Sequence, residues 1–259
     1  MKFAFVFLFI SAQLTLASEE MGAYRDPTMS FEFYQNQMTQ IMTQSRDEDN
    51  VLSTARLYTP ESVPETTRWG SIKLLNARFQ KVRDERLLIW KNHPDFIRRI
   101  TWLYPKDGCF ARAAVANAFF YHQDKVPVPG KAFVFGSLKV KTPFNKNGIA
   151  TWWFHVAPIV QVAGVKYILD PSIESSRPLT LHEWLLRMGN PSQFKLAICG
   201  SGAFAPSDSC HYKTDGIEAR GYAAEAKYLP LEWNNLISLG RSPTNDLGVK
   251  PPWLQPSSL

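Results

Sequence analysis

The stretch Trp152-Trp-Phe-His-Val-Ala-Pro-Ile-Val-Gln-Val-Ala-Gly-Val-Lys-Tyr-Ile-Leu-Asp170 decides the fold of this chain. It contains two runs rich in β-branched and aromatic residues, 152–162 and 165–169, which Ala163-Gly164 alone separates. This spacing predicts two antiparallel strands joined by a tight hairpin. A similar run at 132–140 predicts a further strand of the same sheet.

Helical patterns lie mostly upstream of these strands. Apolar residues recur near helical spacing from Ser71 to about Trp90, and an alanine-rich run without breakers follows the turn signal Asp107-Gly108. The expected helices are 71–90, 95–102, 109–121 and 179–188. Because helices come first and antiparallel strands follow, the pattern predicts an α+β domain with a helix packed on an antiparallel sheet.

Composition excludes several classes of protein. The chain has 259 residues, of which 45% are hydrophobic and 20% charged, and this excludes intrinsic disorder. Its 18 prolines and 14 glycines follow no period, which excludes collagen-like and low-complexity chains. The length predicts one large domain or two small ones, with enough apolar surface for a core.

The N-terminus is typical of a secretory signal peptide. Lys2 precedes a short apolar run, and the small residue Ala17 ends the segment, so we expect residues 1–17 to be removed and the protein to be secreted or periplasmic. The alternative is a buried N-terminal strand. The apolar run is too short for a membrane span, and no later segment is apolar enough, so we expect no membrane anchor.

The chain has three cysteines, an odd number for an exported protein. Cys199 and Cys210 flank a short Gly/Ser-containing segment, which favours a disulfide between them. Cys109 is then left over, so it is either buried and inert or required for chemistry. Because the chain has no CxxC pair and no two histidines at helical spacing, we expect no structural zinc site and no other metal or cofactor.

The position of Cys109 favours chemistry. A thiol at the start of a helix is stabilised as thiolate by the helix dipole, and a thiolate nucleophile needs an imidazole that a carboxylate orients. In the hairpin register His155 lies opposite Ser172, and Asp170 lies diagonally across on the same sheet face, within reach of an imidazole nitrogen. Each residue also has a structural interpretation: an inert buried cysteine, a core histidine and an aspartate that starts a turn.

The segment Trp102-Leu-Tyr-Pro-Lys-Asp-Gly-Cys-Phe-Ala-Arg-Ala113 resembles the nucleophile motif of the bacterial protein-glutaminases, which are secreted protein deamidases. Residues 133–139, 152–157 and 168–172 resemble later blocks of that family in the same order. The resemblance covers roughly 72–190 and is specific from 102 to 178. It implies a transglutaminase-like, papain-like core within a catalytic domain spanning 71–259.

The same resemblance implies a role for each candidate residue. Cys109 is the nucleophile, His155 the general base and acid, and Asp170 the residue that orients His155, whereas Arg112 repeats the motif as structural support. The implied reaction is hydrolysis of glutamine side-chain amides in protein or peptide substrates, through a Cys thioester with release of ammonia. The alternatives are a transglutaminase, then a cysteine peptidase, then a noncatalytic basic binding protein.

Charge is unevenly distributed along the chain. Residues 19–71 carry 4 basic and 9 acidic groups, whereas residues 72–106 carry 9 basic and 3 acidic groups. Opposite charges favour docking, so residues 18–70 are interpreted as an acidic N-terminal extension or short pro-segment whose residues 31–44 cover the Cys109 cleft. The alternatives are an amphipathic helix packed permanently on the domain, and two solvated surfaces. Because export separates the protein from nucleic acid, we expect no nucleic-acid partner.

Overall fold

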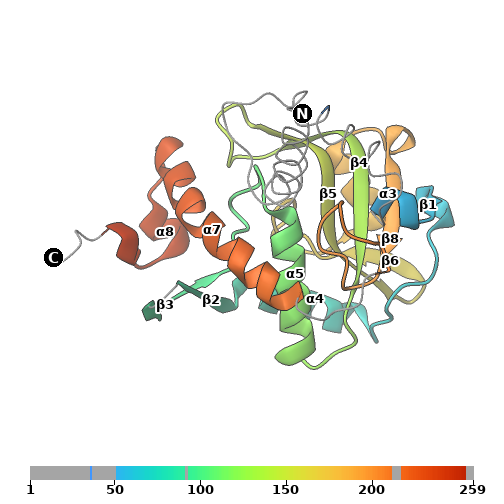
Figure 1. Ribbon diagram of the computed structural model, residues 1–259, viewed down its shortest axis with the longest axis horizontal. Coiled ribbons are helices and arrows are strands. Elements are labelled where there is room, and N and C mark those ends of the chain that lie inside the picture. Colours follow the sequence, from blue (N-terminus) through green and yellow to red (C-terminus); the bar gives the residue numbers. More distant parts are fainter. Residues whose placement is uncertain (1–35, 37–50, 91–92, 212–216, 255–259) are drawn as a thin grey trace, which may run out of the picture.

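A six-stranded antiparallel sheet in the order β1-β8-β4-β5-β6-β7 forms the centre of the structure, a computed structural model (Figure 1). The structure describes residues 36, 51–90, 93–211 and 217–254. The strands of this sheet are β1 (Leu57–Tyr58), β4 (Gly130–Lys141), β5 (Ile149–Val162), β6 (Val165–Ile168), β7 (Leu179–Thr180) and β8 (Lys195–Cys199). The predicted α+β class with an antiparallel sheet is confirmed.

The hairpin between β5 and β6 has the predicted register, with Val162 paired to Val165 and Ile159 to Ile168. Its turn residues Ala163 and Gly164 both have positive φ, 49° and 84°, as a two-residue hairpin with the twist of a sheet requires. The β5–β6 ladder ends at the pair Ile159–Ile168, so Ser172 is not the strand partner of His155 that the register predicted. The chain turns instead, and the N–H of Ile173 donates to the carbonyl of Asp170.

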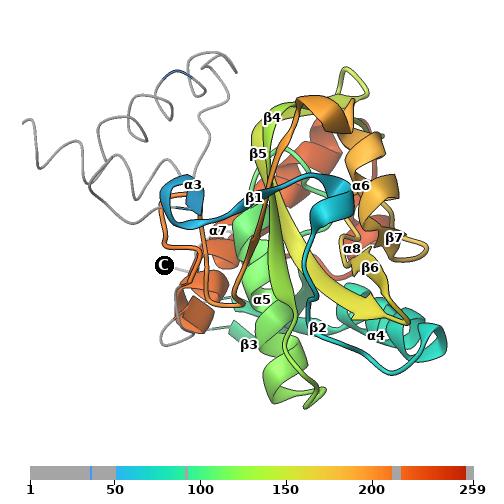
Figure 2. The ribbon, with the colours of Figure 1, turned by 90° about the vertical axis from the view of Figure 1, so that its right-hand side faces the viewer.

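Helices cover both faces of the sheet. The helices are α3 (Val51–Thr54), α4 (Ile72–Asp84), α5 (Cys109–His122), α6 (Leu181–Met188), α7 (Ile217–Ser238) and α8 (Pro243–Leu247), of which α8 packs on α7, and the 3-10 turns are η1 (Pro60–Ser62), η2 (Pro191–Gln193) and η3 (Pro252–Leu254). Figure 2 shows α5 and α6 on opposite sides of the sheet, and α7 packs across α5. Residues on the two faces of β4 alternate accordingly, since Phe133 lies in the core beside α5 and Val134 in the core beside α6.

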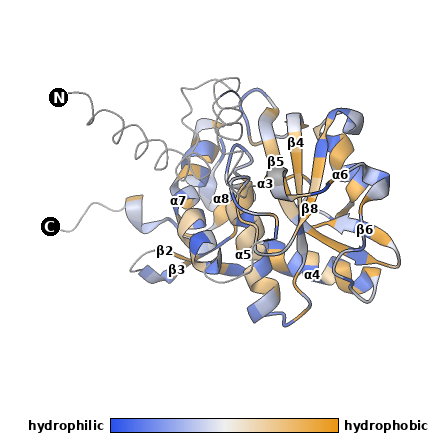
Figure 3. Cartoon of the chain, turned by 45° about the vertical axis from the view of Figure 1, so that its right-hand side comes forward, coloured by the Kyte–Doolittle hydropathy of each residue, from blue (hydrophilic) through white to orange (hydrophobic). Residues whose placement is uncertain are grey.

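The apolar residues gather where α5 meets the central strands (Figure 3). All residues of α5 from Cys109 to Phe120 are buried, between the sheet on one side and α7 on the other. The helix that carries the candidate nucleophile is therefore a core element of the domain.

Two of the predicted helices differ from the structure, one in its length and one in its existence. The helix expected over 71–90 ends at Asp84, and the helix expected over 95–102 is absent. Residues Arg86–Trp90 and His93–Arg99 instead form strands β2 and β3 of a separate antiparallel pair. The run Leu87-Leu88-Ile89 fits helical and strand periods equally, but Leu88 is buried and Ile89 exposed, which is the alternation of a strand.

Residues 51–70 belong to the sheet and its core. Leu57 of β1 pairs with Ala197 of β8, and Trp69 and Val51 are buried. The predicted signal peptide 1–17 lies outside the described residues, as does the predicted covering segment 31–44 apart from Asn36. Among the helices that the structure describes, none is long and apolar enough to cross a membrane.

The predicted disulfide between Cys199 and Cys210 is confirmed. It closes a loop, residues 200–210, that begins at the end of β8 and packs on the start of α5, where the rings of Phe204 and Phe110 lie 5.1 Å apart, edge to face. Cys109 is the third cysteine, and it is free and buried.

Candidate active site

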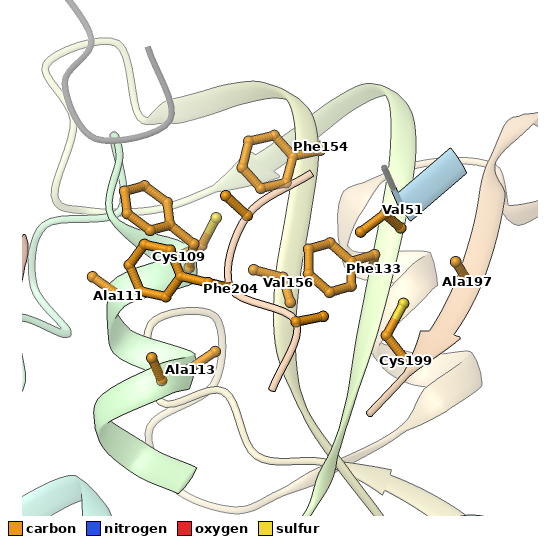
Figure 4. Packing of buried hydrophobic residues seen from close by; sticks show 14 of the residues in the cluster. Val51, Cys109, Ala111, Ala113, Phe133, Phe154, Val156, Ala197, Cys199 and Phe204 are labelled. Atoms are coloured by element: carbon orange, nitrogen blue, oxygen red, sulfur yellow. The ribbon is translucent and has the colours of Figure 1, made fainter. Parts of the chain in front are cut away.

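Cys109 is the first residue of α5, as predicted. Gly108 precedes it with a φ of 83°, and a Cβ at Gly108 would lie only 3.0 Å from the ring of Tyr228, so glycine fits this close turn. The Cys109 side chain faces β5, the strand of Phe154 and Val156 (Figure 4). Because the first N–H groups of a helix have no partner within it, the positive end of the α5 dipole lies at this position.

The structure brings His155 and Asp170 together. His155 comes from the middle of β5 and Asp170 from the turn after β6, and the distance from His155 Nε2 to Asp170 Oδ2 is 2.7 Å. Both side chains are buried, with exposed fractions of 1% and 5%. The sequence predicted this pair from the hairpin register, and the structure places it as predicted even though the ladder ends earlier.

The other ring nitrogen of His155, Nδ1, is buried and has no hydrogen-bond partner within the described residues. Cys109 is close enough to His155 to raise the pKa of the imidazole. One nitrogen is thus held by Asp170, while the other remains available for the thiol and for substrate. This is the division of roles that a Cys–His–Asp arrangement requires.

Burial and charge act in opposite directions on this pair. Burial disfavours the protonated imidazole, but the charge and hydrogen bond of Asp170, together with Cys109, outweigh it and raise the pKa of His155. Burial likewise disfavours the Asp170 carboxylate, but His155, Ser172 and Trp184 lower the pKa of Asp170 below its usual range. Asp170 therefore stays ionised, and an imidazolium is stabilised where a thiolate would need it.

Two further residues hold the Asp170 carboxylate, and sequence reasoning assigned a role to neither. Ser172 donates to Oδ1 through its hydroxyl at 2.5 Å and through its backbone N–H at 3.2 Å. Trp184 of α6 donates its indole N–H to Oδ2 at 2.9 Å. The amphipathic pattern of 179–188 predicted a helix but gave no signal that a buried indole would meet a carboxylate.

Trp152 connects the imidazole to the loop before Cys109. Its ring stacks on His155, with centroids 4.5 Å apart and an angle of 12° between the planes, and its indole N–H donates to the carbonyl of Pro105 at 2.8 Å. Arg112 supports the same loop, because it donates to the carbonyls of Tyr104 and Asp107. Trp152 and Arg112 therefore both support the loop that precedes Cys109.

Within the described ranges, no three side chains of His, Cys, Asp or Glu are grouped so that they could hold a metal ion. The chemistry that this site can perform is that of a thiol, an imidazole and a carboxylate.

Comparison with known proteins gives one family match. Residues 75–188 match the family model Gln_deamidase_2, described as a glutaminase. None of the curated proteins matches this chain at a significant level.

Solved structures of protein-glutaminases are similar to this chain. A crystal structure of protein-glutaminase has 25% identity and a TM-score of 0.48, over 64% of this chain and 90% of that one. The NMR structure of protein-glutaminase from Chryseobacterium proteolyticum has 25% identity and a TM-score of 0.48, over 62% and 89%. A mutant pro-protein-glutaminase has 24% identity and a TM-score of 0.48, over 64% of this chain. This chain spans 60% of the length of that pro-form.

The matched region contains each of the predicted site residues, together with Ser172 and Trp184 that hold the carboxylate. It ends before β8, the disulfide loop and α7. The resemblance to the protein-glutaminase family is thus confirmed over residues 75–188, the part of the chain that carries Cys109, His155 and Asp170.

Proposed function

We propose that this protein is an exported protein-glutamine deamidase that uses Cys109, His155 and Asp170 as its catalytic residues. The observation that carries the proposal is the arrangement around His155: Asp170 on Nε2, Nδ1 without a partner in the described structure, and Cys109 close enough to affect its pKa. The glutaminase family match over the same residues supports the choice of glutamine amides as substrates.

In the proposed reaction, the Cys109 thiolate attacks the side-chain carboxamide carbon of a glutamine. The imidazolium of His155 protonates the departing nitrogen, ammonia leaves, and a thioester remains. His155 then takes a proton from water, which attacks the thioester carbon and releases glutamate and the thiol. The backbone N–H of Cys109, at the start of α5, is the natural first donor to the oxyanion.

We further propose that the core is of the transglutaminase-like, papain-like type. In support, the nucleophile begins a buried helix that packs on an antiparallel sheet, and the sheet presents the imidazole. A transglutaminase uses the same three groups but transfers the acyl group to a lysine amine, so it is the second candidate.

One assay distinguishes the candidate activities. The protein is incubated with casein at neutral pH under mild reductant, and ammonia, cross-linked species and peptide fragments are measured together. Ammonia without cross-links or fragments supports deamidation. Cross-linked species would indicate a transglutaminase, and peptide fragments would indicate a cysteine peptidase. If ammonia, cross-links and fragments are all absent, a noncatalytic basic binding protein is favoured.

We also propose that residues 18–50 restrain the enzyme until they are removed. This proposal rests on charge, because this part of the chain carries 2 basic and 7 acidic groups and precedes a basic region. The appropriate truncation begins at Val51, since removal up to Ser71 would also delete β1 and the buried Trp69. Truncation at Val51 should raise ammonia release, and added salt should activate the longer form. Unchanged activity would contradict the restraint.

A further inference from the structure

The loop 101–108, which leads into the nucleophile, is held largely by side chains. The backbone N–H of Thr101 donates to Glu225 at 3.0 Å, its hydroxyl donates to the same carboxylate at 2.9 Å, and the N–H of Leu103 donates to Glu232 at 2.8 Å. On the acceptor side, Arg112 donates to two carbonyls of the loop and Trp152 to a third. The position of the loop therefore depends on distant side chains.

Both carboxylates come from one face of α7, outside the region of the family match. Glu225, Tyr228 and Glu232 are spaced at i, i+3 and i+7, which places them along one side of a helix. The ring of Tyr228 fills the space beside Gly108, the residue directly before Cys109. One helix face thus contacts the loop at its start, in its middle and at its end.

This arrangement is costly for stability. Glu225 and Glu232 have exposed fractions of 0% and 1%, and neither forms an ion pair within the described residues. Burial raises the pKa of both, while the charges of Arg112 on Glu225 and of Arg99, Arg112 and Arg98 on Glu232 oppose this shift. What the carboxylates provide is a strong acceptor for N–H groups that a hydrophobic side chain would leave unpaired.

We propose that Glu225 and Glu232 are positioning residues, which act through the loop 101–108 to fix Cys109 and its backbone N–H relative to His155. The proposal rests on the proposed function for the identity of the reaction, but it makes a separate statement about the thiol. The loop ends at Gly108, and the helix start that follows it determines where the sulfur and the N–H lie. A displacement of about 1 Å at a reacting group costs about 100-fold in rate.

The test compares three variants of the mature chain. Glu225→Ala removes the acceptor, Glu225→Gln keeps an oxygen that can accept the Thr101 N–H, and Asn235→Ala is the matched control. Asn235 is also a buried polar residue of α7, but its side-chain amide donates to the carbonyl of Phe144, which lies outside the loop 101–108. The measurements are kcat and KM for ammonia release, the melting temperature, and the rate of Cys109 alkylation by iodoacetamide as a function of pH.

We expect Glu225→Ala to lower kcat about 10- to 100-fold with KM nearly unchanged, because the thiol and not the substrate site is displaced. The pH profile of alkylation should shift in the same variant. Glu225→Gln should restore kcat to within about threefold of the wild type. Asn235→Ala should lower the melting temperature and leave both kcat and the alkylation profile unchanged.

The proposal is overturned if Glu225→Ala behaves like Asn235→Ala, with lower stability but wild-type kcat and alkylation. If the wild type releases no ammonia, the proposed function fails, yet the alkylation profiles still decide whether Glu225 positions the thiol. Should Glu225→Ala fail to fold, Thr101→Val carries the same test. It removes the hydroxyl donor of the loop and should lower kcat about threefold to tenfold, and unchanged kcat and alkylation there would also overturn the proposal.

Discussion

The two halves of the candidate site are built in different ways. The His155–Asp170 half lies on a hairpin and the turn after it, and its members are 15 residues apart. The β5–β6 ladder and the hydrogen bond from the Leu169 N–H to the Pro158 carbonyl bring the two residues near each other. The Cys109 half depends on the loop before α5, whose N–H groups are held by carboxylates 124 and 129 residues away along the chain. A strand ladder keeps its geometry when one contact is lost, because its other backbone hydrogen bonds remain. A loop whose N–H groups each depend on one side-chain carboxylate does not keep its geometry when that carboxylate is removed. Substitutions remote from the chemistry should therefore harm the nucleophile more than the base.

The most severe test of this contrast removes the nucleophile itself. Cys109→Ala should abolish ammonia release, because no thioester can form, and it should change the melting temperature little, since it removes only one buried sulfur. Ammonia release from casein and thermal unfolding measure the two effects. Activity near that of the wild type would remove Cys109 from the mechanism.

On the His155 side, the largest effect is expected from Asp170→Asn. The amide keeps the shape of the carboxylate but loses the charge that holds the imidazole in one tautomer, so kcat should fall by about 10⁴-fold. The measurement is kcat for a glutamine peptide, with circular dichroism to establish that the variant is folded. A loss of only a few-fold would mean that another group orients His155.

A smaller effect is expected from Trp184→Phe, which removes one of the donors to Asp170. Because Ser172 still donates to the carboxylate, we expect kcat to fall about tenfold, on the order of one charge-assisted hydrogen bond.

The matched control is Trp69→Phe. The indole of Trp69 is also buried, and it donates to the carbonyl of Pro127, which is not part of the site. The Trp69→Phe variant should have a lower melting temperature and an unchanged kcat. Equal losses of kcat in Trp69→Phe and Trp184→Phe would contradict the assigned role of Trp184.

The smallest effect concerns stability on the Cys109 side. Burial raises the pKa of Glu225 to about 7, above its ordinary value of 4.5, so the folded state binds a proton that the unfolded state releases. The cost of this carboxylate is therefore absent below about pH 4.5, grows as the pH rises toward 7, and stays constant above it. Glu225→Gln removes this cost, so its melting temperature relative to the wild type should be several degrees higher at pH 8 than at pH 5. Thermal unfolding of both proteins at pH 5 and pH 8 measures this difference in melting temperature. If the difference is the same at both pH values, the Glu225 carboxylate is not buried as described.

The sequence predicted the base half of the site better than the nucleophile half, for a physical reason. Register within a hairpin follows from its turn length, so the closeness of His155 and Asp170 could be worked out from the 19 residues 152–170. The start of α5 at Cys109 was also predictable, because Asp107-Gly108 is a strong local signal. No local pattern indicates that a glutamate on one helix will accept an N–H from a loop more than 100 residues away.

The missed hairpin of β2 and β3 illustrates the same limit. Its apolar residues fit the period of a helix and the period of a strand. The strands form because the residues are buried against parts of the chain that are distant in the sequence. Arg98 of β3 is buried because it donates to the carbonyls of Leu247 and Val249 near the C-terminal end. A long-range partner of this kind overrides local preference.

Strand β8 also determines when, during synthesis, the protein can complete its fold. It lies between β1 and β4, so β1 has no strand to pair with until residues 195–199 have emerged from the ribosome. Contacts between segments so far apart in the chain close late and slowly. The loop before Cys109 must wait longer still, until Glu232 of α7 has been added. A growing chain therefore carries its thiol, while the 123 residues from 110 to 232 are added, without the full set of contacts that hold the loop before it in place.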